Sequence, residues 1–128
     1  MTIHTANLPA IVDAYLECAA WSSTHTTEDG EDTPLDEIDA DWSKQAVEQA
    51  KSECADFVNY AEEQFGADIF DGLDAGQIGH DFWLTRNGHG AGFWDRGLGE
   101  QGEQLTKAAK TFGSSDAYIG DDGRIYLS

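Results

Sequence analysis

Basic residues are scarce in this sequence. Seven lysines and arginines stand against 25 aspartates and glutamates, so the formal net charge is −18 at pH 7. A small domain needs a charge of magnitude only about 2–8 to stay soluble. The excess repels nucleic acids and anionic membranes and attracts basic protein surfaces. We therefore expect no direct nucleic-acid binding and no membrane binding. Adaptation to high salt is the alternative explanation of the acidity.

Cysteines and long apolar runs are also scarce. Cys18 and Cys54 are the two cysteines, and each lies among small apolar residues in a helical pattern. Free cysteine behaves as a small buried hydrophobe, and two thiols do not make a secreted disulfide framework. A bridge between the two stays open as an alternative. The first residues lack the pattern of a secretory signal peptide, which is a basic stretch followed by an apolar one. No apolar run approaches about 18 residues either, so we expect a cytoplasmic protein.

Hydrophobic residues, in contrast, are plentiful enough for a core. They make up 40% of the 128 residues, and 14 residues are aromatic. A chain of this size forms one domain, so we predict a single domain over residues 1–128. We predict the α+β class, with a mainly helical, acidic part over 1–74 and a hairpin–helix–hairpin part over 75–128.

Three segments show helical periodicity. Apolar residues recur at helical spacing over 8–21, over a long stretch that begins at Thr33 or Asp41 and ends at Phe65, and over about 100–112. Gly66 and Gly113 follow the last two, where glycine commonly ends a helix. Residues 22–34 have no periodicity and predict a loop, and residues 66–74 predict a broken helical turn.

Two segments have the pattern of β-hairpins. In the stretch His80–Gly97, the apolar runs 82–85 and 91–94 flank the turn residues Asn87-Gly88-His89-Gly90. Near the C-terminal end, the runs 117–119 and 124–127 flank Gly120-Asp121-Asp122-Gly123. An isolated hairpin is only marginally stable, so we expect all four strands to form one antiparallel sheet with helices on one face.

Catalytic and metal-binding patterns are weak. His80, Asp81, His89 and Asp95 suggest acid–base chemistry, but adjacent residues of a strand point to opposite faces and cannot form a His–Asp dyad. The complete calcium-loop pattern is absent, and the histidines and cysteines lack zinc-site spacing. We therefore predict no enzyme activity, no catalytic residues, no metal and no cofactor.

The acidic residues are concentrated in one segment. Residues 28–74 hold 16 aspartates and glutamates against Lys44 and Lys51, which is −14 of the total −18. On the long helix, carboxylates fall opposite the apolar arc, except Glu53, which falls near it without an explanation. A solvated helix face is the simple interpretation. The functional one is a surface that binds a basic partner through the following residues: Glu48, Asp56, Glu62, Glu63, Asp36, Glu37, Asp39 and Asp41.

The C-terminal two-fifths carries a resemblance. The stretch H-D-F-W-L-T-R-N-G-H-G-A-G-F-W-D-R-G, followed by L-T-K-A-A-K-T-F-G and Y-I-G-D-D-G-R-I-Y-L, resembles a family of small, mostly uncharacterised bacteriophage proteins over about 75–128. The resemblance implies a phage-encoded accessory protein directed at the host, and it implies no catalytic residues. Small acidic phage proteins often inhibit nucleic-acid-binding host defences, which is an association with a class rather than with this motif.

Charge and resemblance together give two hypotheses. The first is a non-enzymatic inhibitor in the host cytoplasm that binds a basic nucleic-acid-binding host or defence protein as a DNA mimic, of the anti-restriction or anti-CRISPR type. The alternative is a structural or regulatory phage protein that contacts its partner through the stretch 80–97. Its contact patch would hold four exposed residues, unless the two tryptophans belong to the core: Trp83, Arg86, Trp94 and Arg96.

Overall fold

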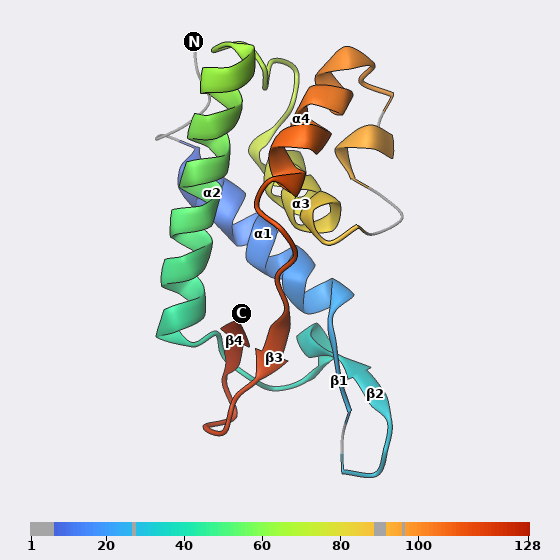
Figure 1. The fold of residues 1–128 in the computed structure, drawn as a ribbon. Helices are drawn as coiled ribbons and strands as arrows, with labels where there is room; N and C mark the ends of the chain where they lie inside the picture. Colours follow the sequence, from blue (N-terminus) through green and yellow to red (C-terminus); the bar gives the residue numbers. More distant parts are fainter. Residues whose placement is uncertain (1–6, 27, 89–91, 96) are drawn as a thin grey trace.

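Four α-helices and two short β-hairpins make up the described part of the chain. The computed structural model describes residues 7–26, 28–88, 92–95 and 97–128. The helices are α1 (Leu8–Ser22), α2 (Lys44–Phe65), α3 (Ala75–Arg86) and α4 (Glu100–Lys110). The strands are β1 (Thr24–Thr26), β2 (Asp32–Pro34), β3 (Ala117–Ile119) and β4 (Ile125–Leu127), and the 3₁₀ turns are η1 (Leu35–Glu37) and η2 (Phe93–Asp95). The architecture is α+β (Figure 1).

Side-chain caps and glycines set the helix ends. The Ser43 hydroxyl accepts a hydrogen bond from the Ala46 amide at 3.0 Å, and this cap starts α2 at Lys44 rather than at Thr33 or Asp41. Gly66 ends α2 with φ of +106°, which a residue with a side chain rarely adopts. The Asp74 carboxylate caps α3 by accepting from the Gln77 amide at 2.7 Å.

The predicted hairpin over 80–97 is wrong. Residues 75–86 form α3, and Phe93–Asp95 form η2, while 89–91 and 96 lie outside the described residues. Of the four predicted turn residues, Asn87 ends the helix and Gly88 has φ of +69°, while His89 and Gly90 lie outside the described residues. The flanking run was misread because nearly every residue from Ile78 to Arg86 is buried, so neither helical nor strand periodicity is visible in it.

The predicted four-stranded sheet is also wrong. The strands form two separate two-stranded sheets, β1 with β2 and β3 with β4. The first lies within 22–34, which was predicted as a loop, so the N-terminal part is not purely helical. Residues beside Trp42 cover the outer edge of β4: the Ile125 amide donates to the Asp41 carbonyl at 2.9 Å, and the Ser43 amide donates to the Ile125 carbonyl at 2.8 Å.

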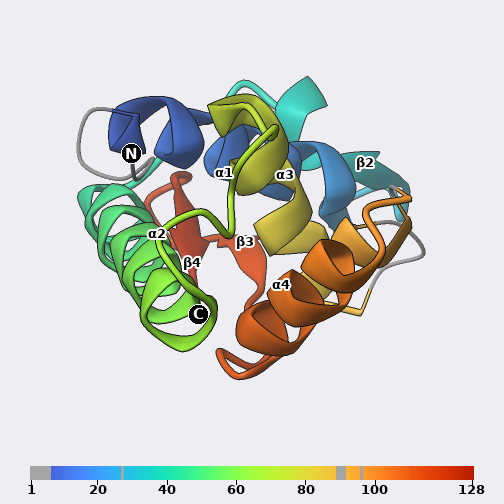
Figure 2. The same cartoon turned by 90° about the horizontal axis from the view of Figure 1, so that it is seen from above.

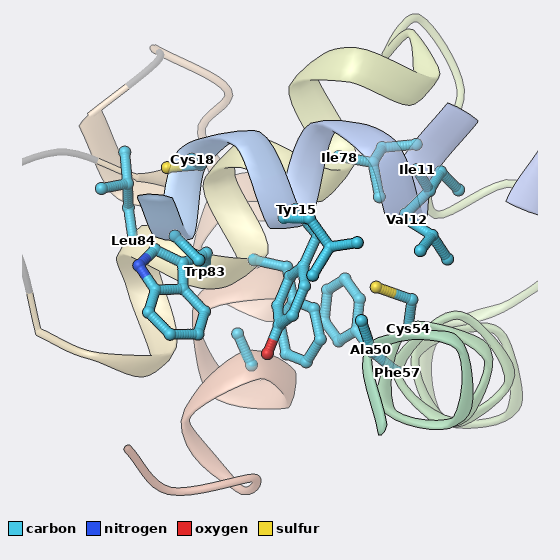
Figure 3. Close-up of a cluster of buried hydrophobic side chains, with 14 of the residues drawn as sticks. Ile11, Val12, Tyr15, Cys18, Ala50, Cys54, Phe57, Ile78, Trp83 and Leu84 are labelled. Atoms are coloured by element: carbon cyan, nitrogen blue, oxygen red, sulfur yellow. The ribbon is translucent and has the colours of Figure 1, made fainter. Parts of the chain in front are cut away.

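One hydrophobic core joins these elements. α1 crosses between α2 and α3, and α4 lies on the far side of α3 (Figures 1 and 2). The Phe57 ring of α2 stacks on the Phe82 ring of α3, with centroids 4.1 Å apart. The ring centroid of Tyr15 in α1 lies 5.2 Å from that of Phe82 and 5.3 Å from that of Trp83. Figure 3 shows Tyr15 and Trp83 in this core. Cys18 and Cys54 are buried in this core as free thiols, so the alternative of a bridge between them is not realised.

Candidate functional site

The most acidic surface is the segment 28–41, which we call the acidic segment. It runs from the turn between β1 and β2 through η1 to the chain before α2 (Figure 1). It contains no lysine or arginine. Its eight carboxylates are all exposed: Glu28, Asp29, Glu31, Asp32, Asp36, Glu37, Asp39 and Asp41. The last four are predicted binding residues. The segment is therefore a continuous negative surface.

The backbone of the acidic segment is held at several points. The β1–β2 pairing sets Thr24 opposite Pro34, and the Leu35 amide donates to the Ser23 carbonyl at 2.9 Å. The Leu35 side chain is 1% exposed and anchors η1 in the core. The bond from Ile125 to the Asp41 carbonyl fixes the other end. The carboxylates are thus displayed on an ordered backbone, which lowers the entropy lost on binding.

The turn between β3 and β4 adds carboxylates beside this segment. It carries Asp121 and Asp122 and leads into β4, which lies beside the chain before α2 (Figure 1). The Ile125 amide of β4 donates to the Asp41 carbonyl. The Tyr126 hydroxyl donates to Asp122 at 2.7 Å. This bond lowers the pKa of Asp122 and raises the pKa of Tyr126. The hydrogen bond from Tyr126 therefore stabilises the ionised form of the Asp122 carboxylate.

The carboxylates predicted on α2 form a sparser surface. Glu48, Asp56 and Glu63 are exposed. They are eight and seven residues apart, or about 12 and 10 Å at a rise of about 1.5 Å per residue. One DNA strand carries a phosphate about every 3.4 Å of helix axis. Lys44 and Lys51 are also exposed on this helix. The α2 charges alone are too widely spaced to copy a DNA strand.

Glu62 differs from the other predicted binding residues. It is half-buried, and its Oε2 atom is buried without a hydrogen-bond partner among the described residues. That oxygen cannot reach a partner surface, so Glu62 is a weaker candidate for binding than the fully exposed carboxylates of α2.

The alternative contact patch is not assembled. Trp83 is 1% exposed and Arg86 is 6% exposed, so both belong to the core, because they lie in the buried second half of α3. The Trp83 indole donates to the Ser22 hydroxyl at 2.8 Å. Trp94 is 52% exposed, while Arg96 lies outside the described residues. An exposed Trp–Arg patch built on 80–97 is therefore wrong for two of its four residues.

Arg86 explains the position of Glu53. Its Nη1 atom lies 3.0 Å from Glu53 Oε2 and donates to the Tyr15 hydroxyl at 2.8 Å. Its Nε and Nη2 atoms donate to the carbonyls of Gly113 and Phe112, just after α4. Glu53 thus faces the core because it pairs with a buried arginine. Sequence reasoning missed this pair, although an acidic residue near an apolar arc was the available signal.

Residues considered for chemistry are only partly brought together. His80 Nδ1 lies 3.6 Å from Asp81 Oδ1, because both lie on α3, so the predicted opposite-face arrangement is wrong. The distance exceeds that of a hydrogen bond. Asp95 is exposed on η2, and His89 lies outside the described residues. Burial raises the pKa of the Cys18 thiol to about 12 and that of Cys54 further, which makes both poor nucleophiles. In the described ranges no three histidine, cysteine or acidic side chains are grouped as metal ligands would be.

Comparisons with known proteins add no relative. The chain matches no family model, no curated protein and no solved structure. Within the part of the chain that the structure describes, no helix combines the length and apolar character needed to cross a membrane.

Proposed function

We propose that this protein binds a basic protein, of the kind that itself binds nucleic acid, through the acidic segment. The observation that carries the proposal is the row of eight exposed carboxylates over 28–41, uninterrupted by a basic residue. Paired strands, a buried leucine and bonds to β4 order the backbone that displays them. Nucleic-acid-binding proteins present positive surfaces for phosphates, and a fixed negative surface complements them.

Inhibition follows from this binding without chemistry. A partner whose basic surface is covered by carboxylates cannot hold a nucleic acid at the same surface. In a phage-infected cell, such a partner would be a restriction, CRISPR or other host defence protein, acted on in the cytoplasm. The acidic segment, rather than α2, is the part that would occupy the nucleic-acid site, since its charges are denser.

The test compares two variants that lose the same charge. The first changes Asp36→Asn, Glu37→Gln, Asp39→Asn and Asp41→Asn in the acidic segment. The control changes Glu48→Gln, Asp56→Asn, Glu63→Gln and Glu103→Gln on α2 and α4. Partners captured from a nuclease-treated bacterial lysate are identified, purified and titrated with each protein.

We expect captured partners to be nucleic-acid-binding proteins, to be released by duplex DNA, and to bind more weakly as salt rises, because exposed charges are screened within about 8–10 Å at about 0.1–0.15 M salt. The acidic-segment variant should lose most of the affinity and the control little. Equal losses for the two variants would leave only a general charge effect and would contradict a specific surface.

A further inference from the structure

An exposed tryptophan lies at the end of α1. Trp21 is 59% exposed, and its ring centroid lies 6.1 Å from that of His80 on α3. Trp83 of α3, whose indole donates to the neighbouring Ser22 hydroxyl, is only 1% exposed, so the exposure of Trp21 contrasts with a tryptophan close by that is buried. Tryptophan is enriched at the centre of protein interfaces, where it stacks well on arginine.

A groove lies next to His80, the ring neighbour of Trp21. It lies between α1 and the start of α3, has a volume of about 650 Å³, and includes His80, which also touches Trp21. Glu17 comes from α1, and Asp74 caps α3. Leu73 and Leu98 supply apolar surface. None of the described residues that line the groove is a lysine or arginine.

The two carboxylates can accept further hydrogen bonds. Glu17 is exposed and makes no hydrogen bond or ion pair with the described residues. Asp74 uses its Oδ1 atom to cap α3, which leaves its Oδ2 atom for another donor. A guanidinium group has five donors in a fixed plane, so it can bond to carboxylates while its face stacks on an aromatic ring. Its aliphatic stem can pack on leucine side chains.

We propose that this groove, with Trp21 at its edge, holds an arginine side chain of the basic partner. The proposal rests on the proposed function and names a second contact for the same partner. α1 continues directly from Trp21 into β1, whose hairpin begins the acidic segment (Figure 1). A partner lying on the acidic segment can therefore reach the groove with a neighbouring side chain.

The test uses the full chain labelled with ¹⁵N and an acetylated, amidated tetra-arginine peptide. Its amide and indole signals are followed by NMR during titration. The peptide should shift the Trp21 indole signal and the amides of Gln77 and His80 in a saturable way. The same peptide made of lysine should bind at least about threefold more weakly, because an ammonium group cannot stack or bond in the same plane.

A charge-neutral variant localises the effect. Glu17→Gln with Asp74→Asn keeps the α3 cap, since asparagine caps as well as aspartate. It should weaken binding at the groove about tenfold, as expected for lost charge-assisted bonds. The control, Glu100→Gln with Glu103→Gln on α4, loses the same charge and should change binding by less than about twofold.

Each outcome separates the two proposals. Shifts confined to residues 28–41 would overturn the groove proposal and leave the acidic segment as the binding surface. Shifts in neither region would overturn both. Equal binding of the arginine and lysine peptides would overturn arginine as the occupant, and equal effects of the two variants would overturn Glu17 and Asp74 as its ligands.

Discussion

At the scale of single residues, Arg86 connects all four helices of the described chain. It joins α3 to Tyr15 of α1, to Glu53 of α2 and to the carbonyls after α4. Its guanidinium carbon also lies 5.4 Å from the centre of the Phe82 ring. The side chain is 3% exposed, so each of these bonds replaces water that the folded state excludes.

Replacing this arginine should be costly. Arg86→Met should lower the free energy of unfolding by about 3–5 kcal/mol, because Glu53 and three other acceptors lose their donor. Glu53→Gln should cost much less, since the Glu53 side chain is 22% exposed and water can reach it. Adding Glu53→Met to Arg86→Met should restore only part of the loss, because two backbone carbonyls stay unpaired. Urea unfolding measures the free energy of unfolding of all three variants. Full recovery of the original stability in the double variant would contradict a role for the two backbone carbonyls.

The buried thiols predict a loss of stability at alkaline pH. Burial raises the pKa of Cys18 from 9.0 to about 12 and raises those of Cys54 and Tyr15 as well. The folded state holds these protons more tightly, so their contribution is complete below about pH 9 and falls as pH rises from there toward about 12. Each group should cost up to about 1.4 kcal/mol per pH unit.

Urea unfolding at a series of alkaline pH values measures this slope. Cys18→Ala should make the slope shallower, while the exposed-site control Glu103→Gln should leave it unchanged. A slope that is the same with and without Cys18 would show that the thiol does not titrate differently in the two states.

At the scale of elements, the close crossing of α1 and α3 depends on Gly79. A side-chain carbon at this position would meet the Ile11 carbonyl oxygen and lie 2.9 Å from the Tyr15 amide nitrogen. Neither backbone atom can move without separating the two helices. The glycine therefore sets the distance at which the aromatic core can pack.

Gly79→Ala should destabilise the protein by at least about 3 kcal/mol, because overpacking against backbone forces the helices apart. Gly76→Ala is the matched control on the same helix: its new carbon would have as its nearest neighbour only an Asp74 carboxylate oxygen, at 3.3 Å. Alanine there should change the free energy of unfolding by less than about 1 kcal/mol, because only the Asp74 side chain has to shift and alanine favours the helix. Thermal unfolding followed by circular dichroism compares them, and similar melting temperatures for the two variants would contradict the close crossing.

The elements differ in how far sequence reasoning could find them. α1, α2 and α4 have one exposed and one buried side, and their periodicity located α1, α4 and the end of α2 within a few residues. The start of α2 was left open between Thr33 and Asp41, and the helix begins after both, at Lys44. The same holds for the C-terminal hairpin, where Asp-Gly lies between apolar runs. α3 could not be recognised, because burial on all sides removes the polar half of the pattern. β1 and β2 were missed because they hold polar threonines rather than alternating apolar residues.

The candidate site was predictable in composition but not in geometry. The density of carboxylates in 28–41 is visible in the sequence, yet nothing there shows that paired strands and β4 hold it in place. Trp83 and Arg86 looked like interface residues by type, and their burial follows only from the crossing of α3 with α1, α2 and α4.

At the scale of the whole molecule, the charge of −18 opposes folding by self-repulsion. Reversing Asp56 and Glu63 to lysine on α2 should therefore raise Tm by a few degrees at low salt. Glu48→Lys should raise it less, because Glu48 lies between Lys44 and Lys51 at helical spacing and would gain like-charge neighbours that cost about 0.2–0.5 kcal/mol each. Calorimetry at low and high salt tests this, and the gains should shrink as salt screens the charges. Gains that persist unchanged in high salt would point to local contacts instead.

The bonds between β4 and the chain before α2 have a consequence for biosynthesis. Besides the bonds at Ile125, the Gln45 amide group bonds to the Leu127 backbone across 82 positions of sequence. A ribosome adds about 5–20 residues per second, so roughly ten seconds pass between the synthesis of these partners. During that interval α1 and α2 can already meet, but Asp41 has no strand to hold it. The Asp41 end of the acidic segment is therefore fixed last, after the pairing of β1 with β2 has already ordered its beginning.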